Sequence, residues 1–243
     1  MFFFNKKRTK SPEITSPISH PVNLTKASQN LESSIVRLKK SGVDLSGHKA
    51  RVFVVVDISG SMGKRFPCEV QNALTRIFPL ALKFDDNGEM EVYVFDTQCS
   101  LLPEPMTMGN YQDYVENYIC SQYQINGGTR YSPFVKQTVI DYNDGSLLPA
   151  FGIVITDGEP FSDDVCKTND EIRKSSKSRV FYQFVGIGRS NFKYLKELDN
   201  LDGRAADNAA FIKVSEISDM SDEELYDKLL EQYPSWLRAM HIN

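Results

Sequence analysis

Oxygen-bearing side chains recur in three short segments of this 243-residue chain, and their chemistry suits a hard metal ion. Asp57, Ser59 and Ser61 alternate in a D-x-S-x-S run, while Thr129 and Asp157 stand further along the chain. Together they offer two carboxylates, three hydroxyls and no imidazole. Mg²⁺, Mn²⁺ and Ca²⁺ prefer such oxygen donors, whereas zinc and copper more often take nitrogen and sulfur ligands. We therefore predict a Mg²⁺ site, with Ca²⁺ or Mn²⁺ as alternatives.

The elements around these residues can bring them together. Apolar residues fill positions 52–56 and 151–155 almost without interruption, which predicts two buried strands ending at Asp57 and Asp157. In an open parallel sheet, ligands collect beyond the carboxyl ends of the strands. Thr129 follows two glycines, which allow a loop to approach closely and present the hydroxyl. The three segments are therefore expected to converge on one edge of a sheet.

The rest of the chain alternates between the helical and the strand period. The expected helices lie at about residues 31–41, 70–84, 111–119, 134–142, 192–195 and 225–240. The expected strands lie at residues 52–56, 89–95, 151–155, 180–186 and 210–214. Pro79 falls inside the second helix and should kink or divide it. This alternation predicts an α/β fold, doubly wound around a mostly parallel central sheet with helices on both faces.

The beginning of the chain differs in composition from the remainder. Residues 5–30 are rich in Lys, Ser, Thr and Pro and hold few large apolar side chains. We expect a flexible N-terminal lead over residues 1–30 and one domain over residues 31–243. The apolar first residues precede the basic ones, the reverse of a secretory signal. No apolar run approaches the ~20 residues of a transmembrane helix, so no transmembrane segment is expected.

Charge and cysteine content narrow the class of protein further. The net charge of −4 lacks the basic excess that is usual in nucleic-acid-binding proteins, so no nucleic-acid partner is expected. The cysteines are widely spaced and form no C-x-x-C pair, which argues against structural zinc. They are Cys68, Cys99, Cys120 and Cys166. We interpret them as small buried hydrophobic side chains in a cytoplasmic protein with reduced thiols.

The candidate ligands also match a known pattern. A D-x-S-x-S run, a distant Thr after Gly-Gly and an Asp closing an apolar strand together resemble the metal-ion-dependent adhesion site (MIDAS) of von Willebrand factor A (vWA) domains. Further segments resemble the TerF-like branch of that family, which is associated with tellurium resistance and stress response. They lie at positions 47–51, 57–62, 83–89, 155–158, 184–188, 198–208 and 231–237.

The resemblance implies binding rather than catalysis. Ser59, Ser61 and Thr129 would hold the cation, with Asp57 and Asp157 acting directly or through water. One open coordination position would accept a carboxylate from a protein partner. The implied function is a divalent-cation-dependent protein-binding module, not an enzyme, in a bacterial stress or tellurium-resistance system.

An enzymatic function is the main alternative. A Mg²⁺ site at the end of a parallel sheet could also serve phosphoryl transfer or hydrolysis. Aspartate phosphatases, however, need a second carboxylate two residues after the first, where this chain has Ser59. The sequence also lacks the G-x-x-x-x-G-K-[ST] loop that binds nucleotide phosphates. A role in sequestering a toxic metal or oxyanion has no thiol or histidine cluster to support it.

Structural roles are the other alternative for individual residues. Taken singly, Asp57 or Asp157 would more often cap a helix than bind a metal, and only the combination favours a ligand set. Asp163 and Asp164 are interpreted as the acidic start of a helix. His48 has no nucleophile paired with it in the sequence, so we interpret it as a surface or hydrogen-bonded side chain.

Overall fold

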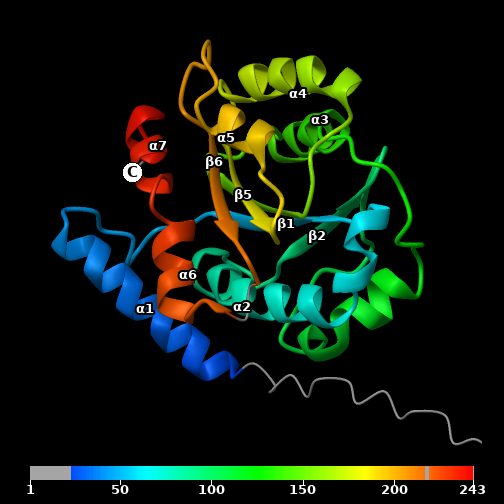
Figure 1. The fold of residues 1–243 in the computed structure, drawn as a ribbon. Coiled ribbons are helices and arrows are strands. Elements are labelled where there is room, and N and C mark those ends of the chain that lie inside the picture. Colours follow the sequence, from blue (N-terminus) through cyan, green and yellow to red (C-terminus); the bar gives the residue numbers. More distant parts are fainter. Residues whose placement is uncertain (1–22, 217–218, 243) are drawn as a thin grey trace, which may run out of the picture.

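A six-stranded sheet forms the centre of the protein, whose computed structural model describes residues 23–216 and 219–242 (Figure 1). The order of strands across the sheet is β3-β2-β1-β4-β5-β6. Neighbouring strands are parallel except for β2 and β3. The strands are β1 (Arg51–Asp57), β2 (Glu91–Phe95), β3 (Cys99–Leu101), β4 (Ala150–Thr156), β5 (Val180–Ile187) and β6 (Ala209–Val214). The predicted fold, doubly wound and mostly parallel, is confirmed.

Helices cover both faces of this sheet (Figure 1). One face carries α1 (Leu24–Lys40), α2 (Cys68–Phe84), α6 (Asp222–Leu229) and α7 (Tyr233–Ala239). The other face carries α3 (Ser132–Tyr142), α4 (Ser162–Ser175) and α5 (Lys193–Asp199). The chain also contains short 3₁₀ turns at Gly60–Arg65 and Tyr111–Asp113 and a π-helical segment at Val115–Cys120.

The central strand β1 separates two apolar cores. Val54 and Val56 pack into the core beneath α1, α2, α6 and α7, while Phe53 and Val55 pack into the core beneath α3, α4 and α5. The side chains alternate in this way because successive Cβ atoms of a strand point to opposite faces. All four residues are fully buried, which explains why this strand appears in the sequence as an unbroken apolar run.

Helix α1 begins earlier than the sequence pattern predicts. The apolar spacing places the start at Leu31, but the helix starts at Leu24. The side chain of Asn23 caps it by accepting a hydrogen bond from the backbone N–H of Lys26 at 3.1 Å. Leu24 is also buried against the core. The expected flexible lead therefore includes residues that are helical, and its remaining part, residues 1–22, lies outside the described residues.

Two further helices differ from expectation. Helix α2 is not divided at Pro79, because extensive burial on both sides of the proline offsets the missing backbone hydrogen bond. The closing helix predicted over residues 225–240 is two helices, since α6 ends at Leu229 and α7 begins at Tyr233. Pro234 lies in the first turn of α7, where its fixed φ and absent N–H favour the start of a new helix.

The interpretation of the cysteines as buried side chains is wrong. Cys68 and Cys166 are exposed, Cys99 and Cys120 are partly exposed, and all four are free thiols. Cys166 lies on α4 between Asp164 and Thr168, which take the buried side of that helix. Its spacing therefore turns it towards solvent.

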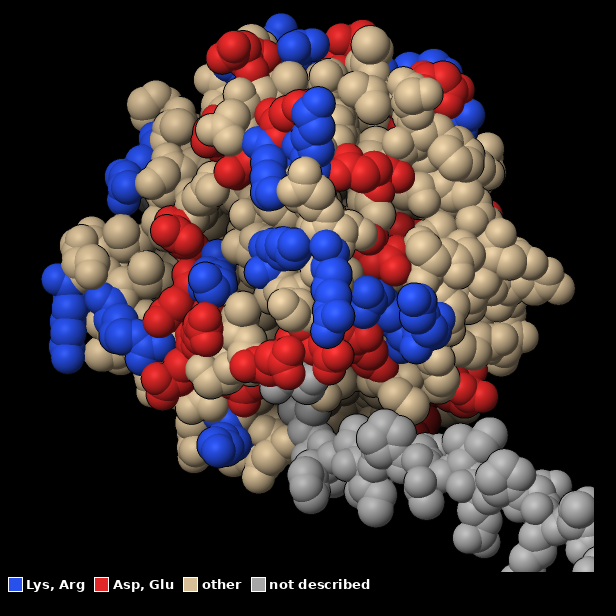
Figure 2. All heavy atoms as spheres, viewed as in Figure 1, with Lys and Arg blue, Asp and Glu red and all other residues tan. Residues whose placement is uncertain are grey.

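The surface carries both signs of charge. On the face shown in Figure 2, Lys and Arg lie among Asp and Glu rather than in one extended basic patch. Ion pairs such as Arg37 with Asp227 and Arg173 with Asp170 lie among the exposed side chains. Among the described residues, no helix is both long and apolar enough to cross a membrane.

Candidate metal centre

The segments that carry the candidate ligands meet at the carboxyl ends of the strands. Asp57 is the last residue of β1, and Asp157 directly follows β4, the neighbour of β1 in the sheet. The loop after β1 pairs with the Gly-Gly loop through a parallel bridge between Ser59 and Gly127. The backbone N–H of Gly60 donates to the Gly127 carbonyl at 2.9 Å. The expected convergence on one edge of the sheet is therefore present in the fold.

Asp57 is the buried base of the site and has no exposed surface. Its Oδ1 accepts the backbone N–H of Ser59 at 2.7 Å, and its Oδ2 accepts the hydroxyl of Thr156 at 2.6 Å. Burial nevertheless raises the pKa of Asp57 to about 6, because removal from water disfavours the charged form. Within the described residues no Lys or Arg forms an ion pair with this carboxylate. A bound cation would therefore stabilise the charged form of Asp57.

A chain of short hydrogen bonds joins the serines to Asp157. The hydroxyl of Ser61 donates to Oδ1 of Asp157 at 2.6 Å. The Ser59 and Ser61 hydroxyl oxygens are 3.2 Å apart. Because Ser61 donates its one hydroxyl proton towards Asp157, its oxygen is free to accept from Ser59, whose hydroxyl also lies within reach of Asp57. Ser61 is exposed, whereas Ser59 and Asp157 are buried, so the network meets solvent at Ser61.

Thr129 lies on the adjoining loop but does not bond to the other four side chains. It is 8% exposed, and its carbonyl accepts the backbone N–H of Phe161 at 2.9 Å. Among the described residues its hydroxyl makes no hydrogen bond to Asp57, Ser59, Ser61 or Asp157. The structure therefore brings four candidate ligands into one network and places the fifth beside it.

The two glycines before Thr129 are required by close packing. A Cβ on Gly127 would lie 2.4 Å from the carboxylate of Asp96, and a Cβ on Gly128 would lie 2.4 Å from the Phe161 ring. Neither separation is possible without movement, since carbon contacts are normal only above about 3.4 Å. The glycines thus let the loop approach the edge of the sheet, as the sequence predicts.

Three residues near the site were not found by sequence reasoning. Arg65 places Nε 3.3 Å from Oδ2 of Asp157. Thr156 holds Asp57, and Asp96 packs against Gly127. Asp96 could have been found, because it directly follows β2 and so lies at the same edge as Asp57. Arg65 had no comparable signal.

The structural interpretations of the nearby acidic residues and His48 agree with the structure. Asp164 is buried and accepts the backbone N–H groups of Tyr131 and Ser132 at 2.7 and 3.1 Å, so it ties α4 to the start of α3. Asp163 pairs with Arg130 on the surface. His48 Nε2 lies 2.9 Å from the hydroxyl of Tyr233 in a partly buried position.

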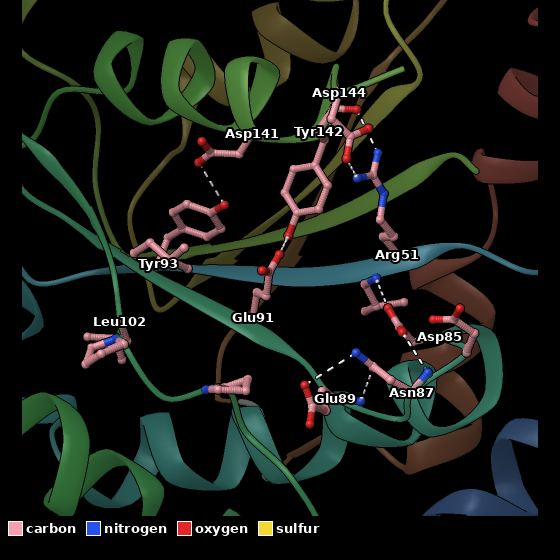
Figure 3. Close-up of a pocket in the computed structure, with 15 residues that line it drawn as sticks. Arg51, Asp85, Asn87, Glu89, Glu91, Tyr93, Leu102, Asp141, Tyr142 and Asp144 are labelled. Carbon is pink, nitrogen blue, oxygen red and sulfur yellow. Dashed lines mark hydrogen bonds and ion pairs between the residues drawn. The ribbon is translucent and has the colours of Figure 1, made fainter. Parts of the chain in front are cut away.

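A second concentration of carboxylates lies at the opposite edge of the sheet (Figure 3). This cavity of about 460 Å³ is lined by six acidic side chains, namely Asp85, Asp86, Glu89, Glu91, Asp141 and Asp144. Tyr142 donates to Glu91, Tyr93 donates to Asp141 at 3.0 Å, and Arg51 pairs with Asp144 at 2.8 Å. Several carboxylates are thus bound by the protein's own side chains, and none of the predicted ligands lies here. No group of three or more His, Cys, Asp or Glu in the described chain is arranged to hold a metal ion.

Comparison with known protein families identifies the type of domain that contains the candidate metal centre. A model of the vWA domain found at the C terminus of TerF matches residues 49–243. The chain belongs to the TerF-like vWA family. Its relatives include the uncharacterized protein YcbR of Bacillus subtilis strain 168, which is 37% identical over 219 residues, 87% of each chain.

Solved structures with a similar fold include two proteins that hold metal ions. Proximal thread matrix protein 1 of the mussel byssus has a zinc-occupied MIDAS motif; its TM-score is 0.57 at 14% identity, over 77% of this chain and 46% of that chain. The manganese-loaded TRAP protein of Plasmodium vivax has a TM-score of 0.53 at 16% identity, over 75% of this chain and 74% of that chain. At these identities the likeness establishes the vWA fold of the present chain.

Proposed function

We propose that this vWA domain is a divalent-cation-dependent protein-binding module whose metal ligands are Asp57, Ser59, Ser61, Thr129 and Asp157. The observation that carries the proposal is the hydrogen-bonded chain from Ser59 through Ser61 to Asp157, beside the fully buried Asp57. Short contacts between hydroxyls and carboxylates from distant parts of the sequence gather the donor atoms that a hard cation requires.

The roles of the residues follow from their hydrogen bonds. Asp157 accepts a hydrogen bond from the Ser61 hydroxyl, which leaves a lone pair of the Ser61 oxygen for a cation. Both oxygens of Asp57 accept hydrogen bonds, so this carboxylate holds its loop in place and supplies negative charge below the site. A bound divalent cation would supply an electrophilic centre at the surface, next to the exposed Ser61.

Magnesium is the proposed ion. Two carboxylates and three hydroxyls are fewer charged ligands than calcium sites usually provide, and Mg²⁺ keeps several waters in such sites. Calcium and manganese remain alternatives to be measured. Zinc is measured with them, because proximal thread matrix protein 1 holds zinc in its MIDAS motif.

The proposed partner is a protein that offers a carboxylate to the metal. The site opens to solvent at Ser61, while Asp57, Ser59 and Thr129 are buried, so a ligand can approach from one side only. The mixed charges of the surface in Figure 2 and the net charge of −4 give no support to a nucleic-acid partner.

Non-enzymatic function is proposed as well. vWA domains are generally interaction modules rather than enzymes. In this chain the position two residues after Asp57 is Ser59, whose hydroxyl faces Ser61 and cannot act as the second carboxylate of an aspartate phosphatase. The family match supports a bacterial stress or tellurium-resistance setting, and the four free thiols of the described residues support a cytoplasmic location.

Capture of partners with and without metal tests this function. The tagged full chain would be incubated with extract of its native cell in Mg²⁺ and in EDTA, beside Thr129→Ala and Thr129→Ser. We expect a specific partner that is released by EDTA, lost with Thr129→Ala and retained with Thr129→Ser, because serine keeps the hydroxyl. The unfolding free energy of Thr129→Ala should fall by no more than about 1 kcal/mol. Partners that bind equally in EDTA, or equally to Thr129→Ala, would contradict a metal-bridged contact.

A further inference from the structure

Arg65 is the one described cation in direct contact with a candidate metal ligand. Its Nε lies 3.3 Å from Oδ2 of Asp157, and its Nη1 lies 2.8 Å from Oε2 of Glu69. The side chain is only 15% exposed. Its guanidinium lies against the backbone of Gly188, where an added Cβ would lie 2.3 Å from Nη2. The contact with Asp157 is therefore a packed feature of the site rather than a loose surface pair.

The positive charge of Arg65 opposes the binding of a cation at the site. Arg65 competes for Asp157, since one carboxylate oxygen takes the Ser61 hydroxyl and the other takes the guanidinium. It also offsets one of the two negative charges contributed by Asp57 and Asp157. Like charges repel across a partly buried site more strongly than in water, because screening is weaker there.

We infer that Arg65 is a built-in counter-cation that weakens metal binding by this domain and holds Asp157 in place when no metal is bound. The inference rests on the proposed function, since it assigns a regulator to the same metal site. By limiting the negative charge of the site, Arg65 leaves a bound cation less neutralised by protein ligands and therefore more attractive to a partner carboxylate.

Glu69 should affect the metal affinity of the site in the direction opposite to Arg65. It lies four residues after Arg65, in the first turn of α2, and forms an ion pair with it. Its other oxygen, Oε1, is buried and has no hydrogen-bond partner among the described residues. Glu69 thus draws part of the Arg65 charge away from Asp157. Removal of the Glu69 charge should leave Arg65 more strongly bound to Asp157 and make metal binding weaker.

Calorimetric titration of Mg²⁺ into the EDTA-treated, dialysed full chain tests both directions. Arg65→Gln should bind Mg²⁺ roughly tenfold more tightly than wild type, as expected for loss of one like charge near the ion. Arg65→Lys keeps the charge and should stay close to wild type, and Glu69→Gln should bind roughly threefold more weakly. Arg173→Gln, in the last turn of α4, is the matched control and should leave affinity unchanged.

The titration results test the role of Arg65 separately from the existence of the metal site. A merely structural role of Arg65 would lower or leave unchanged the Mg²⁺ affinity of Arg65→Gln, and either result would overturn the inference while the metal site stands. If no variant and no wild-type protein binds Mg²⁺, Mn²⁺, Ca²⁺ or Zn²⁺, the proposed function fails and the inference fails with it. Thermal melts in EDTA verify that each variant is folded, and Arg65→Lys and Glu69→Gln keep the test decisive if Arg65→Gln is unstable.

Discussion

Asp57 and Asp157 occupy different environments although both lie at the carboxyl ends of neighbouring strands. Asp57 is sealed from solvent and accepts hydrogen bonds from Ser59 and Thr156. Asp157 is 8% exposed and contacts Ser61 and the guanidinium of Arg65. In the absence of metal, Asp57 therefore carries the larger cost of buried charge.

Replacement of Asp57 by Asn tests that cost. In EDTA at pH 7, Asp57→Asn should raise the unfolding free energy by about 1 to 3 kcal/mol, because it removes a buried charge while keeping the size of the side chain. The pKa of Asp57, raised to about 6, also indicates that burial disfavours the charged carboxylate. Urea unfolding of both proteins measures the difference. Added Mg²⁺ should stabilise wild type and not the variant; a variant less stable than wild type in EDTA would contradict the explanation.

Sequence reasoning found the residues of the site that end a strand and missed those fixed by tertiary contacts. Asp57 and Asp157 were recognisable because each closes an apolar run. The contact between Arg65 and Asp157 joins positions far apart in the sequence, and no local pattern marks it. Thr156 lies between the predicted strand 151–155 and Asp157, and no sequence pattern marks the support that its hydroxyl gives to Asp57.

At the scale of elements, the first turns of α1 contact the rest of the domain. Leu24 is buried, and the Asn30 side chain donates to Asp222 of α6 at 3.3 Å. A chain starting at Leu31 should therefore be less stable than one starting at Asn23 by at least about 2 kcal/mol, through lost burial and lost helical turns. Denaturant unfolding of the two truncations compares them, and equal stability would show that the first turns of α1 contribute nothing.

His48 links the segment before β1 to α7 and should make stability depend on pH. Burial lowers the pKa of His48 to about 4, from an ordinary value of 6.5. Between pH 6.5 and 4 the unfolded chain therefore binds a proton at His48 that the folded chain does not bind. The contribution of neutral His48 to the free energy of unfolding is complete above pH 6.5 and is lost as the pH falls towards 4. Allowing for partial exposure, the loss should be about 1 to 2 kcal/mol.

His48→Gln isolates this effect, because it keeps a hydrogen-bonding group near Tyr233 without the titration. Unfolding free energies of wild type and variant would be measured between pH 4 and 7. Their difference should change with pH in the expected direction, wild type losing stability faster on acidification. Parallel curves would mean that His48 does not titrate differently in the folded state.

The main strands and helices were predictable from periodicity, and the exceptions have physical causes. β3 has three mostly exposed residues, too short and too polar to give a strand pattern. The division between α6 and α7 was hidden because their apolar residues keep helical spacing across the break. The early start of α1 depends on a polar cap at Asn23, which the apolar spacing does not reveal.

At the scale of the whole molecule, the sheet and its two cores exist independently of the metal edge. The cores are built mostly from β-strand and helix residues, while the candidate ligands lie at strand ends, in the 3₁₀ turn after β1 and in the Gly-Gly loop. A metal should therefore stabilise the fold without being needed for it. At a free Mg²⁺ concentration of 100 times Kd, linkage gives about 2.7 kcal/mol.

The most direct test of the central claim is calorimetric titration of Mg²⁺ into EDTA-treated wild type and Ser61→Ala. Ser61 is exposed and contributes one hydroxyl, so its loss should leave the unfolding free energy in EDTA within about 1 kcal/mol of wild type. We predict a single binding site in wild type and an affinity at least about tenfold lower in Ser61→Ala, a difference of about 1.4 kcal/mol. Equal affinity in the two proteins, or no binding of Mg²⁺, Mn²⁺, Ca²⁺ or Zn²⁺ by wild type, would contradict the assignment of this edge as a metal centre.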